Sequence, residues 1–130
     1  MISRRILLGV AALSPFFAVT AAKASGAIAF TIAEFEAAQA KGSAILVDVT
    51  APWCPTCRAQ APIIEKLSAQ PNFKGLVVFH VDFDSRGDVL QKFNVQKQST
   101  LIAFKGTKEM GRSVGDTDAS SIESLLNLTV

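Results

Sequence analysis

Residues 44–57 read AILVDVTAPWCPTC and decide the fold, because they join one apolar strand directly to the start of a helix. The run 44–50 is interrupted only by Asp48, a pattern typical of a central strand that is covered on both faces. A helix is expected over about residues 54–69. The two cysteines of this stretch are therefore expected where a buried strand gives way to a helix N-terminus.

The rest of the chain alternates between apolar strand patterns and amphipathic helix patterns. Thr31-x-x-Glu34 is a capping box, and we expect Ile32 and Phe35 of its helix to face inward. Further strands are expected at 27–30, 76–83, 100–104 and 109–114, and further helices around 88–93 and after Asp118. The order β-α-β-α-β-α-β-β-α requires parallel crossovers first and an antiparallel hairpin last. It predicts an α/β three-layer sandwich with a central mixed sheet flanked by helices.

Residues 1–24 have the three parts of a secretory signal: a basic start, an apolar run over 6–19 and a small-residue exit, AKA, at 22–24. We expect cleavage after Ala24, which leaves residues 25–130 as one exported domain. An uncleaved anchor would need a longer apolar run. The start also resembles a twin-arginine export signal, and the choice between the two routes stays open. Either route predicts a periplasmic protein.

The net positive charge of the chain comes from this leader. Of the 13 Lys and Arg residues, three lie within residues 1–24, so the remaining 106 residues carry 10 cations against 11 Asp and Glu. This balance gives no support for nucleic-acid binding. No later stretch approaches the roughly 20 apolar residues of a membrane span. A body of this size can bury its own core, and we expect a monomer.

Cys54 and Cys57 are the only cysteines, and their position suits redox chemistry. A helix N-terminus stabilises a thiolate, so we expect Cys54 to be the exposed nucleophile. Cys57 is expected to be the shielded thiol that resolves a mixed disulfide and closes a Cys54–Cys57 disulfide. A closed zinc site would need two more ligands, and His80 is the only histidine. A purely stabilising bridge would gain little from so short a loop.

At these residues the chain resembles the thioredoxin family over nearly the whole exported domain. The family pattern places a buried Asp before the first cysteine, Trp directly before it and a kinking Pro after the second, here Asp48, Trp53 and Pro62. Segments 93–95 and 100–105 resemble the family's sequence around its active-site proline, and Gly115 matches a glycine near the substrate surface. The resemblance implies a thioredoxin-like fold and a CPTC active site without an organic cofactor or a metal.

Two positions depart from the family pattern. Ser99 stands where the family has a cis-proline, and His80 stands where thioredoxins usually have a lysine beside the buried Asp. A cis bond before Ser costs about 3 to 4 kcal/mol, so we expect a trans Gln98–Ser99 bond. The Ser99 N–H and its hydroxyl can each donate toward the Cys54 sulfur.

The resemblance also suggests a role for each neighbouring residue. Asp48 is expected to take the proton of Cys57, directly or through water, and His80 either tunes that step or only packs. Trp53 is expected to shield the thiols and offer an apolar docking surface. The remaining candidates for substrate binding or tuning are Pro55, Thr56, Ser99, Thr100 and Gly115.

These features predict a periplasmic reductase of protein disulfides that is recharged by a membrane electron-transfer protein, with cytochrome c maturation as the expected use. Three other functions stay open. The protein could oxidise secreted proteins, or two chains could share a metal or iron–sulfur centre through four thiolates. It could also be a non-catalytic interaction domain.

Overall fold

The computed structural model describes residues 26–130, so the predicted leader and its cleavage point lie outside the described residues. The elements follow the predicted order, with one added 3₁₀ turn, η1, after α2. The strands are β1 (Ile28–Ala29), β2 (Ala44–Thr50), β3 (Val77–Asp82), β4 (Thr100–Lys105) and β5 (Lys108–Val114). The helices are α1 (Ile32–Ala40), α2 (Pro55–Ser68), η1 (Pro71–Phe73), α3 (Gly87–Lys92) and α4 (Ala119–Asn127).

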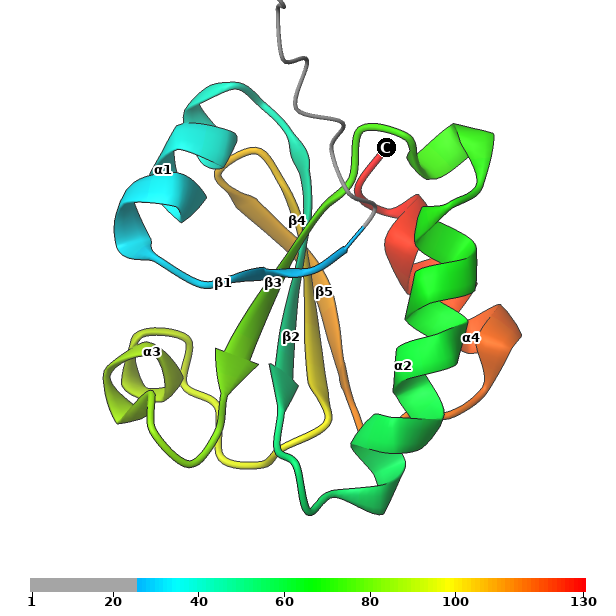
Figure 1. The fold of residues 1–130 in the computed structure, drawn as a ribbon. Coiled ribbons are helices and arrows are strands. Elements are labelled where there is room, and N and C mark those ends of the chain that lie inside the picture. The colour runs from blue at the N-terminus through cyan, green and yellow to red at the C-terminus, as the bar shows by residue number, and fades with distance from the viewer. Residues whose placement is uncertain (1–25) are drawn as a thin grey trace, which may run out of the picture.

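The five strands form one mixed sheet in the order β1-β3-β2-β4-β5. The β1/β3 and β2/β3 pairs are parallel, whereas β2/β4 and β4/β5 are antiparallel. Helices α1 and α3 cover one face of the sheet, and α2 and α4 cover the other (Figure 1). The predicted three-layer α/β sandwich, with parallel crossovers first and a hairpin last, is therefore confirmed.

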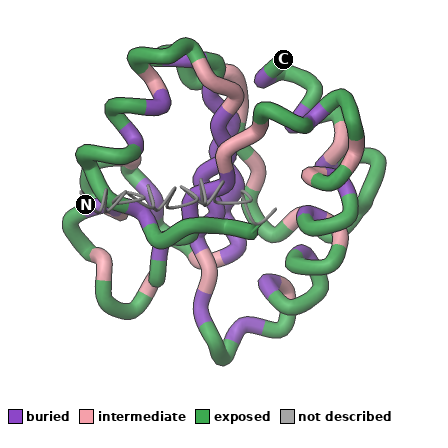
Figure 2. The backbone as a smooth tube through the Cα atoms, turned by 45° about the horizontal axis from the view of Figure 1, so that its top comes forward, coloured by how far each residue is buried: buried purple, intermediate pink, exposed green. Residues whose placement is uncertain are grey.

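Two apolar clusters fill the spaces between the layers. One contains Val47 and Val49 of β2 together with the phenylalanines beneath α1 and α3, and the other contains Leu46 with residues of α2 and α4. Figure 2 shows the buried backbone concentrated in the central strands. Because side chains alternate along a strand, Asp48 points with Leu46 toward the α2 layer. The carboxylate therefore lies on the same side of the sheet as the cysteine helix.

The predicted helix caps are present, but one inward residue was assigned wrongly. The Thr31 hydroxyl accepts the Glu34 N–H at 3.1 Å, and the Asp118 carboxylate accepts the Ser120 N–H at 3.0 Å. Phe35 is buried as expected, whereas Ile32 is 40% exposed. Ile32 is the first residue of α1, next to the two-residue edge strand β1, so the sheet offers it little to pack against.

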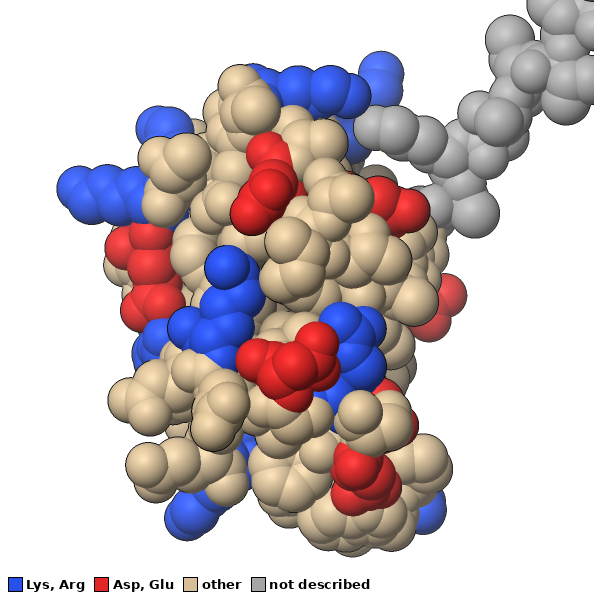
Figure 3. Space-filling view, turned by 90° about the vertical axis from the view of Figure 1, so that its left-hand side faces the viewer, with Lys and Arg blue, Asp and Glu red and all other residues tan. Residues whose placement is uncertain are grey.

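The outer surface carries charges of both signs. On the face over α1 and α3, Lys and Arg side chains alternate with Asp and Glu (Figure 3). Among residues 26–130, none of the helices combines the length and the apolar character that crossing a bilayer requires.

Candidate active site

The two cysteines occupy the first turn of α2. Cys54 is the N-cap residue, and its sulfur accepts the Cys57 N–H at 3.1 Å. Pro55 follows at the first helical position, where its missing N–H costs no hydrogen bond. The free N–H groups of the helix start are thus directed at the Cys54 sulfur, as the sequence predicted.

Both cysteines are free thiols and both are buried. Cys54 is 1% exposed and Cys57 is 6% exposed, and they pack with Ala51 and Phe83. The prediction that Cys54 would be exposed is therefore wrong, whereas Cys57 is shielded as expected. The physical reason is the segment before β4, which places the Ser99 hydroxyl against the Cys54 sulfur.

Ser99 contacts both sulfurs. Its Oγ lies 3.1 Å from Cys54 Sγ and 3.0 Å from Cys57 Sγ. The described residues contain no cis peptide bond, so the predicted trans bond before Ser99 is confirmed. The backbone of Ser99 takes a left-handed conformation with φ of 62°. Its N–H donates to the Val49 carbonyl at 2.8 Å, so the expectation that this N–H points to Cys54 is wrong and only the hydroxyl does so.

The hydrogen bonds around Cys54 favour its thiolate. Burial acts in the opposite direction and raises the pKa of the Cys54 thiol. Hydrogen bonds from the Cys57 and Ser99 side chains and from the N–H groups of Cys57 and Thr56 outweigh burial and hold that pKa below its usual value. A serine hydroxyl has one hydrogen and two lone pairs. It can therefore donate to an ionised Cys54 while it accepts the S–H of Cys57.

Gln60 is a site residue that the sequence reasoning missed. Its side chain is 1% exposed, and its Nε2 donates to the Asp116 carbonyl at 2.8 Å and to the Ser99 carbonyl at 3.3 Å. The sequence pattern of the helix did contain a sign that Gln60 is buried. Gln60 shares the buried stripe of α2 with Cys57 and Ile64, where an amphipathic helix normally has apolar residues.

Asp48 and His80 form a pair across neighbouring strands. Asp48 Oδ2 lies 3.2 Å from His80 Nε2, with the carboxylate buried and the imidazole about half exposed. The hydrogen bond to Asp48 raises the pKa of His80, burial lowers it to a smaller extent, and the Asp48 charge raises it further. The imidazole thus contacts the buried carboxylate through Nε2, while about half of the side chain is exposed to solvent.

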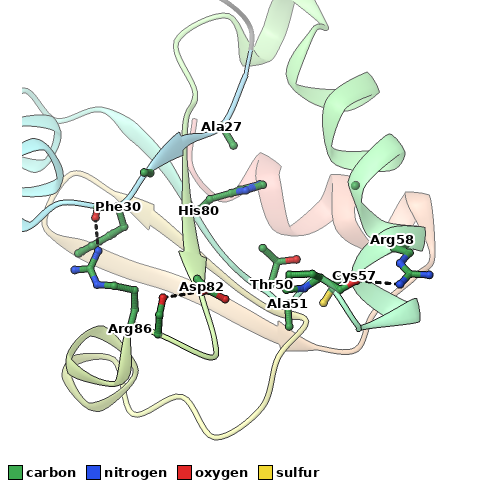
Figure 4. Close-up of a pocket in the computed structure, with 13 residues that line it drawn as sticks. Ala27, Phe30, Thr50, Ala51, Cys57, Arg58, His80, Asp82 and Arg86 are labelled. Carbon is green, nitrogen blue, oxygen red and sulfur yellow. Dashed lines mark hydrogen bonds between the residues drawn. The ribbon is translucent and has the colours of Figure 1, made fainter.

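A groove of about 640 Å³ is lined by His80 of this pair and by the resolving cysteine, Cys57. Cys57 and Arg58 line it from α2, and His80 and Asp82 line it from β3. Figure 4 shows the His80 ring extending from β3 toward α2. Because the groove is open to solvent, water within it can carry a proton between Cys57 and the surface.

The remaining predicted residues surround the cysteines in different ways. Trp53 is 53% exposed, and its indole N–H donates to Asp84 at 2.9 Å, so its ring presents an apolar surface to solvent. Thr100 is buried, and its hydroxyl donates to the Lys97 carbonyl at 2.6 Å, which fixes the turn before β4. Gly115 is exposed and has a φ of 71°.

The sequence and the fold both match one family. The family model for Thioredoxin matches residues 15–128. Thioredoxin-1 of Saccharomyces cerevisiae is 39% identical over 90 residues, which cover 69% of this chain and 85% of that protein. A thioredoxin of Chlamydia trachomatis is 35% identical over 64% of this chain and 79% of its own length.

A solved structure agrees with these relatives. The crystal structure of Trxlp from Edwardsiella tarda is 42% identical and superposes with a TM-score of 0.76, covering 78% of this chain and 98% of that one. The CxxC pair at the start of α2 lies where disulfide exchange requires it. The chain belongs to the thioredoxin family and is a thiol–disulfide oxidoreductase.

Proposed function

We propose that this protein is an exported reductase of protein disulfides that acts in the periplasm and is recharged by a membrane electron-transfer protein. The observation that carries the disulfide chemistry of this proposal is the arrangement of Cys54 at the N-cap of α2, with hydrogen bonds that lower its pKa and with Cys57 within reach of the same Ser99 hydroxyl. One cysteine is thus prepared to attack and the other to resolve.

The first step is attack on a client disulfide. The Cys54 thiolate forms a bond to one client sulfur, and the client's S–S bond breaks. The departing client thiolate takes a proton from solvent. Because the Cys54 sulfur is buried beneath Ser99, the segment before β4 must move to admit the client.

The second step releases the client. Cys57 loses its proton and attacks the Cys54 sulfur, which breaks the mixed disulfide and forms the Cys54–Cys57 disulfide. The client leaves with two thiols, and the enzyme has given up two electrons. Asp48 is the base for the Cys57 proton, and His80, which contacts Asp48 and lines the groove together with Cys57, passes that proton to solvent.

The reductive direction is supported by what surrounds the cysteines. Thr56 and Pro55 lie between them, and neither adds a positive charge that would further stabilise the Cys54 thiolate. Within residues 26–130, the connections between strands and helices contain no inserted domain. The relatives at 35–39% identity are named as thioredoxins.

The reduction potential of the Cys54–Cys57 couple tests this direction. We expect a value nearer the ~−270 mV of thioredoxin than the ~−120 mV of the strongest periplasmic oxidant. The measurement is equilibration with glutathione buffers, read by thiol alkylation and mass spectrometry. A value near −120 mV would reject the reductase and support an oxidant of secreted proteins.

One observation favours that oxidant as the second candidate. Ser99 contacts both sulfurs in the dithiol form, and interactions that stabilise the dithiol make the disulfide more oxidising. If the protein is an oxidant, its disulfide form should oxidise a reduced model protein faster than its dithiol form reduces the disulfides of the same model protein. The same purified protein, supplied in each redox state, allows both rates to be compared.

The burial of the cysteines argues against a metal centre shared between two chains. Cys54 and Cys57 are 1% and 6% exposed, so four thiolates could reach one ion only after the segment around Ser99 opened in both chains. Zinc or iron titration of the reduced protein, followed by size-exclusion chromatography, separates the two functions. A metal-bearing dimer would reject the monomeric oxidoreductase.

The cellular location is tested through the leader. Export and cleavage after Ala24 predict a mature protein that starts at Ser25 and is found in the periplasmic fraction. Replacing Arg4 and Arg5 by lysine should stop export if the twin-arginine route is used and leave it unchanged otherwise. An unprocessed protein in the cytoplasmic fraction would contradict the proposed location.

A further inference from the structure

Gln60 links two loops, and one of them carries Ser99, whose hydroxyl contacts the cysteine sulfurs. Its Nε2 carries two hydrogens, and it has two acceptors: the Ser99 carbonyl before β4 and the Asp116 carbonyl after β5. The side chain is 1% exposed, so water does not replace these bonds. A buried amide with two main-chain partners on separate segments restrains both segments relative to α2.

The Ser99 conformation needs such a restraint. A non-glycine residue at φ of 62° is disfavoured, and Ser99 lacks the ring that would fix the backbone of a proline. Its N–H is held by Val49 at 2.8 Å, and its carbonyl is held by Gly115 N–H at 3.0 Å and by Gln60 at 3.3 Å. These bonds hold the residue in the conformation that directs its hydroxyl at the sulfurs.

We propose that Gln60 is a positioning residue of the redox site: it fixes the Ser99 main chain and thereby holds the Ser99 hydroxyl between the sulfurs of Cys54 and Cys57. This inference rests on the proposed function for its chemical meaning. It adds Gln60, about one helical turn after Cys57 on α2, to the residues that influence the pKa of Cys54. Gln60 makes no hydrogen bond to either sulfur and acts through Ser99.

The proposal predicts that substitutions of Gln60 and Ser99 have non-additive effects on the pKa of Cys54. Gln60→Met keeps the length of the side chain but removes both donors, so Ser99 should lose its fixed position and Cys54 one hydrogen bond. We expect the pKa of Cys54 to rise by about one unit, as for the loss of a hydrogen bond to a charged group. In a Ser99→Ala background the hydroxyl is already absent, so Gln60→Met should add no further shift.

The measurement is the pH dependence of the alkylation rate of Cys54 in the purified protein, with the site identified by mass spectrometry. Gln91→Met is the matched control, since Gln91 is exposed on α3, and it should leave the pKa unchanged. Additive shifts in the double variant, or no shift in Gln60→Met, would overturn the proposal. This assay uses no client, so it can fail while reduction of a model disulfide through Cys54 succeeds.

A second measurement needs no variant and therefore does not depend on how a variant folds. In the unaltered protein, the two side-chain amide hydrogens of Gln60 should exchange with solvent at least about tenfold more slowly than those of Gln91, because each is buried and hydrogen-bonded. Amide exchange followed by NMR gives both rates. Equal rates would show that Gln60 does not hold the two carbonyls.

Discussion

Asp48 on β2 and His80 on β3 are register partners, and their side chains meet at 3.2 Å between Oδ2 and Nε2. Neighbouring strands in parallel register bring these two side chains to the same face of the sheet. Asp48 is buried and His80 is about half exposed. The pair therefore joins the α2 face of the sheet to solvent.

The pair should make folding stability depend on pH. Since the pKa of His80 is raised in the folded state, the stabilisation is fully present below the unfolded value of 6.5 and is lost as pH rises through the folded value. His80→Asn should therefore cost more stability at pH 6 than at pH 9, by less than about 1 kcal/mol because the ring is half exposed. Urea unfolding of both proteins at each pH measures the difference. A difference independent of pH would mean that the imidazole does not pair with Asp48.

Asp48 should matter for resolution of the mixed disulfide. Asp48→Asn keeps the shape but removes the proton acceptor, so we expect the mixed disulfide to decay at least about tenfold more slowly at pH 7. The deficit should shrink as hydroxide replaces the base at higher pH. Stopped-flow tryptophan fluorescence can follow the decay, because Trp53 is the only tryptophan. Decay unchanged from pH 6 to 9 would exclude the base role, with His80→Asn as the comparison.

The two cysteines should be distinguishable by trapping. Cys57→Ser leaves the Cys54 thiolate free to attack but removes the resolving thiol, so a mixed disulfide should accumulate. Cys54→Ser should trap little, because Cys57 lies three residues after the N-cap and its sulfur does not receive the N–H groups of the helix start. Non-reducing electrophoresis after exposure to a model protein disulfide gives the amounts. Equal trapping by the two variants would reject the assigned roles.

The Ser99 hydroxyl and the Ser99 backbone should have separable effects. Ser99→Ala and Ser99→Gly both remove the hydroxyl, so both should raise the pKa of Cys54 by a similar amount, about one unit. Only glycine adopts φ of 62° without a steric penalty, so Ser99→Gly should be about 1 kcal/mol more stable than Ser99→Ala. Alkylation kinetics and urea unfolding measure the two quantities. Equal stability of the two variants would contradict the left-handed backbone.

The elements and their order could be predicted because they depend on local patterns. The apolar run of β2, the Thr31 and Asp118 caps and the cysteines at a helix start each act over a few residues. Ile32 was misplaced because its exposure depends on where the sheet ends, which the helix pattern does not contain.

The details of the site depend on contacts between distant segments and could not be predicted in the same way. Cys54 is buried by Ser99, 45 positions later, and the Ser99 N–H is taken by Val49 of the central strand. Gln60 reaches Asp116 across 56 positions. Residue types at these positions indicated which groups could donate or accept, but only the packed fold determines which partners they find.

The main chain of Ser99 has a consequence for which proteins this enzyme can recognise. A bound peptide can add to a protein as an extra strand only where N–H and carbonyl groups are free to pair with it. At Ser99 the N–H already donates to Val49, and the carbonyl already accepts from Gly115 and Gln60. A client lying over the thiols therefore cannot pair with the Ser99 main chain as an added strand, and the exposed Trp53 ring is an apolar surface that its side chains can contact instead.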